Sequence, residues 1–369
     1  MTRAQKNFDY GILLMTFVLL CFGVVMVHSA SSVLSLRRYA DSFYFLKRQI
    51  LWASVGVILM MILSNYDYHK WRKWAPRLAV VAFVLLVVVL LPGVGRNVNG
   101  SKAWLGIGSF GVQPSEFAKL AMILFLAHLL ADSKDRMGSF WKGFVPPLFL
   151  SLVCVGLVML EPDLGQSVVI MGTTVILLFA AGARVSHIGS LGGAGLLAFG
   201  GLVAAAPYRM DRITSFLNPW KDPLGTGYQI IQSLYAVGSG GLLGLGLGQS
   251  RQKYLYLPEP QTDFIYSIIS EELGLLGAAS VLLLFAVLIW RGLRAAIYAE
   301  DEFGALLAVG ITGMIGVQVL INVGVVTGSI PATGVTLPFI SYGGSSMTLM
   351  LAAVGILLNI SKQGAPTVR

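Results

Sequence analysis

The sequence predicts an all-α polytopic membrane protein with about ten transmembrane helices and one large loop, and three observations lead to this prediction. The chain is 56% hydrophobic and 12% charged, whereas soluble domains are about half apolar and about a quarter charged. Apolar runs long enough to cross a hydrocarbon core of about 30 Å recur along the whole chain. The largest segment without such a run covers residues 207–263. We therefore treat residues 1–369 as one membrane domain.

Ten apolar runs are the predicted spans. They cover residues 10–30, 50–66, 78–91, 117–131, 144–160, 168–183, 186–206, 264–290, 304–327 and 339–360. The second, third and sixth are short, so their ends are poorly defined by the sequence. The first follows Arg3 and Lys6 as a signal peptide would, but its apolar stretch is too long for one, and we interpret it as a retained helix. The 207–263 loop then connects the seventh and eighth spans.

The distribution of lysine and arginine predicts the orientation. An even number of spans places both termini on one side, where ends and loops carry 14 of these residues, against seven in the short segments opposite. The positive-inside rule puts the termini in the cytoplasm and the 207–263 loop outside, since long loops translocate largely regardless of charge. The net charge of +9 is partly this anchoring signal, and no basic module interleaved with aromatic residues is present. We expect no nucleic-acid partner.

Glu116 and Lys119 form the first candidate site. They are spaced i, i+3 at the start of the fourth span, so they can pair on one helix face. One interpretation is a self-neutralised pair that holds two helices together. The other, which we favour, is a functional groove, because charges inside a membrane bundle mark pathways or sites. The next connection, Glu161-Pro162-Asp163-Leu164-Gly165, is either an ordinary acidic turn or part of a site, and Asp163 could also cap the following helix.

Asp263 is the strongest single candidate, because it stands between the long polar loop and the eighth apolar run. A carboxylate there is costly to bury and is not needed for anchoring. If Asp263 opens a helix, Ser267, Ser270 and Gly274 share its face, and this polar stripe favours an aqueous crevice inside the bundle. Glu271 lies off this face and Glu272 lies opposite.

The 207–263 loop contains further polar candidates. Residues 228–237, which include Gln232, are predicted to form a short helix on or in the membrane surface. The glycine-rich residues 238–249 lack the context of a nucleotide-binding loop, so we expect the glycines to serve backbone bending or close approach. Arg251 and Lys253 either bind phosphate or lie at the headgroup level. Cys21 and Cys154 fall within apolar runs and are interpreted as small buried hydrophobic residues.

Several ordered motifs resemble one family over nearly the whole chain. The motifs are Gln113-Pro114-Ser115-Glu116, Arg212-Ile213 with Asn218-Pro219-Trp220, Gly248-Gln249-Ser250, Leu257-Pro258-Glu259 with Thr262-Asp263-Phe264-Ile265, Glu271-Glu272-Leu273-Gly274, and Leu337-Pro338-Phe339-Ile340-Ser341-Tyr342-Gly343-Gly344-Ser345-Ser346. In these motifs the chain is similar to the SEDS family (shape, elongation, division and sporulation), and within it to the FtsW and SpoVE members more than to RodA. Gln261 stands where many division proteins have histidine.

The resemblance implies a peptidoglycan glycosyltransferase of the bacterial plasma membrane, which polymerises lipid II on the outer face in cell division or sporulation. It implies ten spans, and a class B penicillin-binding protein as the partner transpeptidase. The family's essential aspartate corresponds to Asp263. Lys102 stands where many members have arginine, so the bidentate phosphate contact of an arginine is not expected there.

The residues agree with this chemistry. Forming a β-1,4 bond from an α-linked glycosyl pyrophosphate requires inversion, a base for the attacking 4-hydroxyl, and cations for the departing pyrophosphate. Asp263 is the candidate base, with Glu259 as the alternative. Mg²⁺ or Mn²⁺ could share the cationic role, although no motif identifies ligands. The candidate substrate-binding residues are Lys119, Glu116, Lys102, Arg209, Arg212, Asp163, Gln232, Arg251, Glu259 and Ser341. Two rival functions remain open: a transporter of the lipid-linked precursor, and a non-catalytic scaffold for a transpeptidase.

Overall fold

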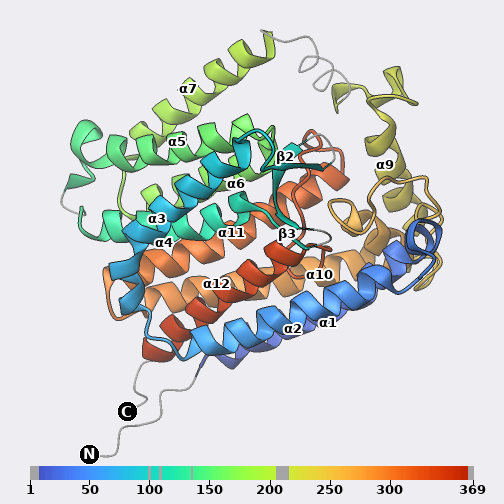
Figure 1. Ribbon diagram of the computed structural model, residues 1–369, viewed down its shortest axis with the longest axis horizontal. Helices are drawn as coiled ribbons and strands as arrows, with labels where there is room; N and C mark the ends of the chain where they lie inside the picture. The colour runs from blue at the N-terminus through green and yellow to red at the C-terminus, as the bar shows by residue number, and fades with distance from the viewer. Residues whose placement is uncertain (1–7, 99–100, 108–109, 134–135, 205–215, 365–369) are drawn as a thin grey trace, which may run out of the picture.

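Each of the ten apolar runs overlaps a helix of the computed structural model, which describes residues 8–98, 101–107, 110–133, 136–204 and 216–364 (Figure 1). The helices are α1 (Tyr10–Tyr39), α2 (Tyr44–Ser64), α3 (His69–Leu90), α4 (Pro114–Ala131), α5 (Val145–Leu160), α6 (Leu164–Ala180), α7 (Val185–Ala204), α10 (Ile265–Ile297), α11 (Glu302–Val326) and α12 (Gly344–Gln363). Within the described part, eight helices are long and apolar enough to cross a membrane. The polytopic all-α class is thus confirmed, and the number of ten spans stays a prediction.

The connections separate into two ends of the bundle. The backbone N–H of Asp9 donates to the Oγ of Ser361 at 3.2 Å, so α1 begins where α12 ends. Tyr68, in the α2–α3 turn, donates its N–H to Asn359 at 2.9 Å and its hydroxyl to Asp301 at 2.8 Å. The α1–α2 connection, α9 and the segment before α10 lie at the opposite end (Figure 1). We call these the terminal end and the loop end. The assignment of the terminal end to the cytoplasm stays a prediction.

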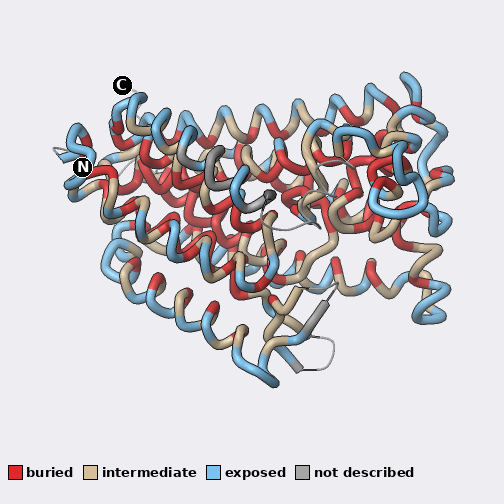
Figure 2. Tube along the Cα trace, turned by 90° about the horizontal axis from the view of Figure 1, so that it is seen from above, coloured by how far each residue is buried: buried red, intermediate tan, exposed pale blue. Residues whose placement is uncertain are grey.

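Helices α4, α11 and α12 form the centre of the bundle, where buried residues concentrate (Figure 2). Small residues permit the close helix packing. A Cβ on Gly355 of α12 would lie 2.5 Å from the carbonyl oxygen of Met60 in α2, and a Cβ on Gly56 would lie 2.5 Å from Leu351. Close backbone approach at small residues is typical of membrane helices, because lipid-facing surfaces gain little from hydrophobic contact.

The β-structure in the connection between α3 and α4 was not predicted from the sequence. The connection contains a small antiparallel sheet of β1 (Arg96–Val98), β2 (Ser101–Ile107) and β3 (Phe110–Val112), in the order β1-β2-β3. The sheet packs against α3 and α4. The short helix predicted over residues 228–237 is present as α9 (Tyr228–Gly240), which follows the 3₁₀ turn η3 (Pro219–Lys221). Its position at the membrane surface stays a prediction. The Oγ of Ser233 anchors it, lying 2.8 Å from the Oγ of Ser267 in α10 and donating to the carbonyl of Val326 at 2.7 Å.

The predicted polar stripe along the eighth span is wrong beyond Ser270. Helix α10 begins at Ile265, and at Gly274 the backbone leaves the helical region with φ 65° and ψ −168°. A helical projection through Gly274 therefore does not apply. Ser267 is hydrogen-bonded to Ser233, and Ser270 donates to the carbonyl of Tyr266 at 2.8 Å, so both hydroxyls have protein partners.

Candidate active site

Asp263 lies in the turn before α10, and its backbone is fixed from two sides. The Nδ2 of Asn322, in α11, donates to the carbonyl of Asp263 at 2.7 Å and to that of Val335 at 2.8 Å. Ser341 Oγ donates to the carbonyl of Thr262 at 2.5 Å and accepts the N–H of Leu337 at 2.8 Å. The segment between α11 and α12 and the turn before α10 are therefore one hydrogen-bonded unit at the loop end.

The carboxylate of Asp263 is half-buried and accepts the hydroxyl of Thr262 at 2.9 Å. Burial raises the pKa of Asp263 to about 6; the Thr262 hydrogen bond opposes this shift, and the nearby Glu259 adds to it. At pH 7 such a group is mostly ionised, yet it is a stronger base than an ordinary aspartate. This combination suits a general base.

Glu259 serves the shape of the same turn. Its Oε2 accepts the Nε2 of Gln261 at 2.8 Å, and its carbonyl accepts the hydroxyl of Thr262 at 2.9 Å. Its Oε1 lies 4.0 Å from the Nη1 of Arg38, whose side chain is 56% exposed. Glu259 has φ 47°, a left-handed conformation that favours glycine, so the surrounding turn constrains it. These contacts support a loop-shaping role.

The last turn of α1 and the first turns of α2 supply cations that the sequence reasoning used only for topology. Arg38 ends α1 near Glu259, and Arg48 of α2 lies 4.5 Å from the centre of the Tyr44 ring and interacts with Tyr342. The available signal was the density of basic residues between positions 37 and 48, which also include Arg37 and Lys47. Arg38 is an exposed cation beside the turn that carries Asp263.

The second cluster joins α4 to α6. Lys119 Nζ lies 2.9 Å from Glu116 Oε2, and both side chains are nearly fully buried. Gln166 donates its Nε2 to Glu116 at 2.8 Å, and its backbone N–H to Asp163 at 3.0 Å. Gln113 donates to the other oxygen of Asp163 at 2.9 Å. The predicted pair and the predicted α6 cap are confirmed, and burial raises the pKa of Asp163.

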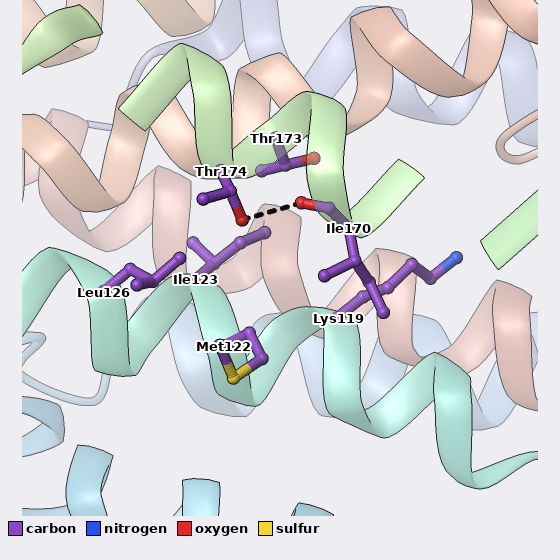
Figure 3. Close-up of a pocket in the computed structure, with 7 residues that line it drawn as sticks. All are labelled: Lys119, Met122, Ile123, Leu126, Ile170, Thr173 and Thr174. Carbon is purple, nitrogen blue, oxygen red and sulfur yellow. Dashed lines mark hydrogen bonds between the residues drawn. The ribbon is translucent and has the colours of Figure 1, made fainter. Parts of the chain in front are cut away.

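Beside this cluster lies a cavity of about 10 Å³, room for one water, formed by Lys119, Met122, Ile123, Leu126, Ile170, Thr173 and Thr174 (Figure 3). The aliphatic part of Lys119 contributes to its wall, and the ammonium group points away (Figure 3). The cavity is mostly apolar and far too small for a sugar. Any substrate contact of Lys119 would therefore lie on the opposite, polar side.

The two clusters are connected through the segment before α12. A Cβ on Gly165, at the start of α6, would lie 2.4 Å from the carbonyl oxygen of Thr333 and 2.8 Å from Val335. The side-chain amide of Asn322 donates both to the carbonyl of Val335 and to the carbonyl of Asp263. The start of α6 and the Asp263 turn are thus both linked to the segment that contains Val335.

The other predicted site residues lie apart from these clusters or have partners of their own. Lys102, in β2, donates its Nζ to the carbonyl of Leu91 at 3.0 Å and so caps the end of α3. Gln232 is half-buried in α9, and Arg251 is exposed. Arg209 and Arg212 lie outside the described residues. In the part of the chain that is described, no group of three or more His, Cys, Asp or Glu could hold a metal ion, so metal ligands stay unassigned.

The fold and the site define a class: a polytopic membrane protein with a constrained aspartate and basic residues at the loop end of its helices. The family model described as "Cell cycle protein", which covers FtsW, RodA and SpoVE, matches residues 10–365. The chain belongs to this family.

Named relatives are similar to this chain over almost its whole length. It is 56% identical to stage V sporulation protein E of Bacillus subtilis (strain 168), over 98% of this chain and 99% of that one. It is 44% identical to a probable peptidoglycan glycosyltransferase FtsW of Geobacter sp. (strain M18), over 97% and 98%.

Solved structures share the fold. A chain from "Structural coordination of polymerization and crosslinking by a peptidoglycan synthase complex" has a TM-score of 0.81 at 30% identity, and the match covers 97% of this chain and 98% of that one. The crystal structure of Thermus thermophilus RodA has a TM-score of 0.71 at 29% identity and covers 96% of each chain.

Proposed function

We propose that this protein is a peptidoglycan glycosyltransferase that polymerises lipid II at the outer face of the bacterial plasma membrane, in cell division or sporulation. One observation carries the proposal: a half-buried aspartate with a pKa of about 6 lies in a turn fixed by Asn322 and Ser341, beside Arg38. The relatives named as glycosyltransferases supply the reaction class. The substrate follows from that class and from the position of the aspartate at a membrane surface.

Asp263 accepts the proton of the attacking 4-hydroxyl. As the oxygen attacks the anomeric carbon of the donor, the bond to the pyrophosphate breaks and the configuration inverts. The raised pKa places Asp263 near the operating pH, which is the condition for efficient proton transfer. The hydroxyl of Thr262, at 2.9 Å, and the backbone N–H of Asp263 both donate to the carboxylate and hold it in position.

The departing pyrophosphate needs positive charge. Arg38 and the exposed Arg251 are the described candidates at the loop end. Buried Lys119 can act only where the Glu116–Gln166 cluster opens toward substrate. A divalent cation such as Mg²⁺ is usually bound through one or two carboxylates and the substrate phosphates. A bound cation would neutralise charge on the leaving group, and its protein ligands stay unassigned among the described residues.

The proposed partner rests on the solved relative, and the proposed orientation rests on the distribution of lysine and arginine. A transpeptidase of the class B penicillin-binding type would crosslink the strands, in line with the coordination of polymerization and crosslinking by the peptidoglycan synthase complex whose fold is shared. The termini lie in the cytoplasm and the Asp263 turn lies outside, as the lysine and arginine distribution favours.

The test is polymerisation by the purified protein, with and without a class B transpeptidase, using lipid II and gel separation of the strands. Wild type should make long strands, Asp263→Asn should make almost none, and Glu259→Gln should keep substantial activity. A transporter would move lipid II between leaflets of proteoliposomes without making strands, and a scaffold would do neither. If Asp263→Asn polymerises normally while Glu259→Gln does not, the base has been assigned to the wrong carboxylate.

A further inference from the structure

The break in α10 is filled by another part of the chain. In a continuous helix the N–H groups of residues 275 and 276 would donate to the carbonyls of residues 271 and 272. Here the Gly241–Gly246 segment is inserted between these groups and satisfies all four. The bonds are Leu245 N–H to Glu271 C=O (3.0 Å), Gly246 N–H to Glu272 C=O (3.0 Å), Leu275 N–H to Gly241 C=O (2.9 Å) and Leu276 N–H to Leu242 C=O (3.2 Å).

The insertion depends on glycine. Gly244 has φ 81°, and a Cβ there would lie 2.2 Å from the carbonyl oxygen of Glu272. A Cβ on Gly274 would lie 2.4 Å from the backbone nitrogen of Gly244. Only a segment without side chains at these contacts can enter the helix this closely. This explains the glycine-rich 238–249 stretch, which carries no nucleotide-binding signature.

Two adjacent buried carboxylates bind the chain that directly follows the insertion. Glu272 accepts the hydroxyl of Ser29, in α1, at 2.7 Å, and lies 3.2 Å from the Nζ of Lys253. Glu271 accepts the hydroxyl of Ser250 at 2.5 Å and the backbone N–H of Arg251 at 2.9 Å. We call these contacts the carboxylate lock. It joins α1, α10 and the chain that follows the insertion.

The outward surface of this insertion is made of leucines. Leu243 is 79% exposed, and Leu242 and Leu247 are also exposed, as are Leu275 and Leu276 beside the break. This apolar surface continues onto the outward face of α10 at Leu283. In water, so many neighbouring exposed leucines would be unfavourable.

The length of α10 indicates the depth of the break. Arg291 follows Gly274 by 17 residues and belongs to the terminal end, where it pairs with Asp9. At about 1.5 Å per residue the distance is roughly 26 Å, so the break lies just inside the opposite face of a hydrocarbon core of about 30 Å.

We propose that residues 241–247 form a re-entrant segment that lies in the outer leaflet against the acyl chains of bulk phospholipid, and that the carboxylate lock keeps it inserted in α10. Backbone outside a regular helix is tolerated at membrane depth only where it is buried in protein or lines a water-filled cavity. Here the N–H groups of residues 244–246 and the C=O groups of residues 241, 242 and 246 are bonded within the protein, and four of these six bonds are to α10. Part of the 207–263 loop is then a membrane element. This inference does not depend on the enzymatic activity.

The test uses the full chain in nanodiscs, in a background in which Cys21 and Cys154 are replaced by alanine. Leu243→Cys is labelled with an environment-sensitive fluorophore and compared in lipids with brominated and unbrominated acyl chains. Leu283→Cys is the lipid-facing control and Lys221→Cys the aqueous control. Bromine should reduce the emission at position 243 at least twofold, as at 283. Quenching no greater than at 221 would overturn the proposal.

The lock is tested by adding Glu272→Gln, or separately the milder Ser29→Ala, to the Leu243→Cys protein. Each should lower bromolipid quenching at position 243 and raise its quenching by aqueous iodide, with the larger change for Glu272→Gln. Quenching at 283 should stay unchanged, which reports an intact bundle. If quenching at 243 is unaffected while 283 is normal, the carboxylates do not hold the segment.

Discussion

The Nδ2 of Asn322 lies 2.7 Å from the backbone oxygen of Asp263, so a membrane helix distant in sequence sets the position of the candidate base. The same nitrogen donates to the carbonyl of Val335 at 2.8 Å. One buried carboxamide therefore links α11, the turn before α10 and the segment before α12. The geometry of the site depends on this link as well as on the carboxylate itself.

The first prediction concerns this link. Asn322→Ala leaves two carbonyls without their donor, which costs about 1–3 kcal/mol for a buried group, and it lets the Asp263 turn move. We expect kcat for strand formation to fall roughly 10- to 100-fold with a much smaller change in KM, since proximity effects of this size accompany displacements of about 1 Å. Thr327→Val, exposed at the end of α11, is the matched control. Wild-type kcat in Asn322→Ala would refute the positioning role.

The second prediction is the pH dependence of catalysis. The base must be ionised, and burial raises the pKa of Asp263 to about 6. We expect kcat/KM for lipid II to fall as the pH drops through 6, approaching about tenfold per pH unit below it. Glu259→Gln should keep this acidic limb. A limb at the ordinary aspartate pKa of about 4 would contradict the environment described for Asp263.

The third prediction separates activity from stability. The pKa of Asp263 is about 6 in the folded protein and about 4 in the unfolded chain. Protonated Asp263 therefore contributes its full stabilisation below about pH 4, and this stabilisation is lost as the pH rises through 6. Asp263→Asn, which is neutral at every pH, should therefore abolish strand formation at pH 7.5 without lowering the melting temperature. Thermal unfolding in detergent, followed by fluorescence, provides the measurement. A marked loss of stability would mean that the carboxylate is mainly structural.

The fourth prediction concerns the Glu116–Lys119 pair. Lys119→Ala leaves a buried carboxylate without its cation, and breaking such a pair typically costs about 3–5 kcal/mol. Exchanging the two residues should restore much of the stability. If the ammonium also serves the substrate, the exchanged protein stays inactive, because the charges occupy reversed places beside Gln166. Full strand formation by the exchanged protein would leave the pair a purely structural role.

Much of the fold could be predicted because transmembrane helices are encoded locally. Long apolar runs and the asymmetry of lysine and arginine depend on composition, and the predicted runs coincide with α1–α7 and α10–α12. The small sheet was missed, although Asn99-Gly100 and Gly108-Ser109 are hairpin-type dipeptides. The strands are too short for an alternating pattern to stand out between the apolar runs on either side.

The candidate site could be predicted only in part, because its contacts are long-range. Asp263 and the Glu116–Lys119 pair stand out by position or spacing. The roles of Asn322 and Ser341 depend on how α11 and the segment before α12 pack. Glu271 and Glu272 seemed peripheral on a helical projection, since no local pattern shows that α10 breaks at Gly274 to receive another segment.

The last prediction concerns Glu161, which follows α5 and is fully buried. Burial raises the pKa of Glu161 to about 8, and the neighbouring Asp163 adds to the shift. Because the folded pKa is raised, the stabilisation from the protonated form is full below about pH 4, the unfolded value, and is lost as the pH rises through 8. The melting temperature should therefore decline between pH 6 and 9, and Glu161→Gln should reduce this decline.

Asp222 provides the control for Glu161. It is exposed, and hydrogen bonds from the backbone of Thr226 and Gly225 lower its pKa. Any stabilisation from Asp222 is thus present above the unfolded pKa and lost only in acid, so Asp222→Asn should leave the alkaline decline unchanged. Melting curves recorded from pH 5 to 9 distinguish the two carboxylates. If Glu161→Gln shows the same alkaline decline as wild type, then another group is responsible and Glu161 is ionised in the folded protein.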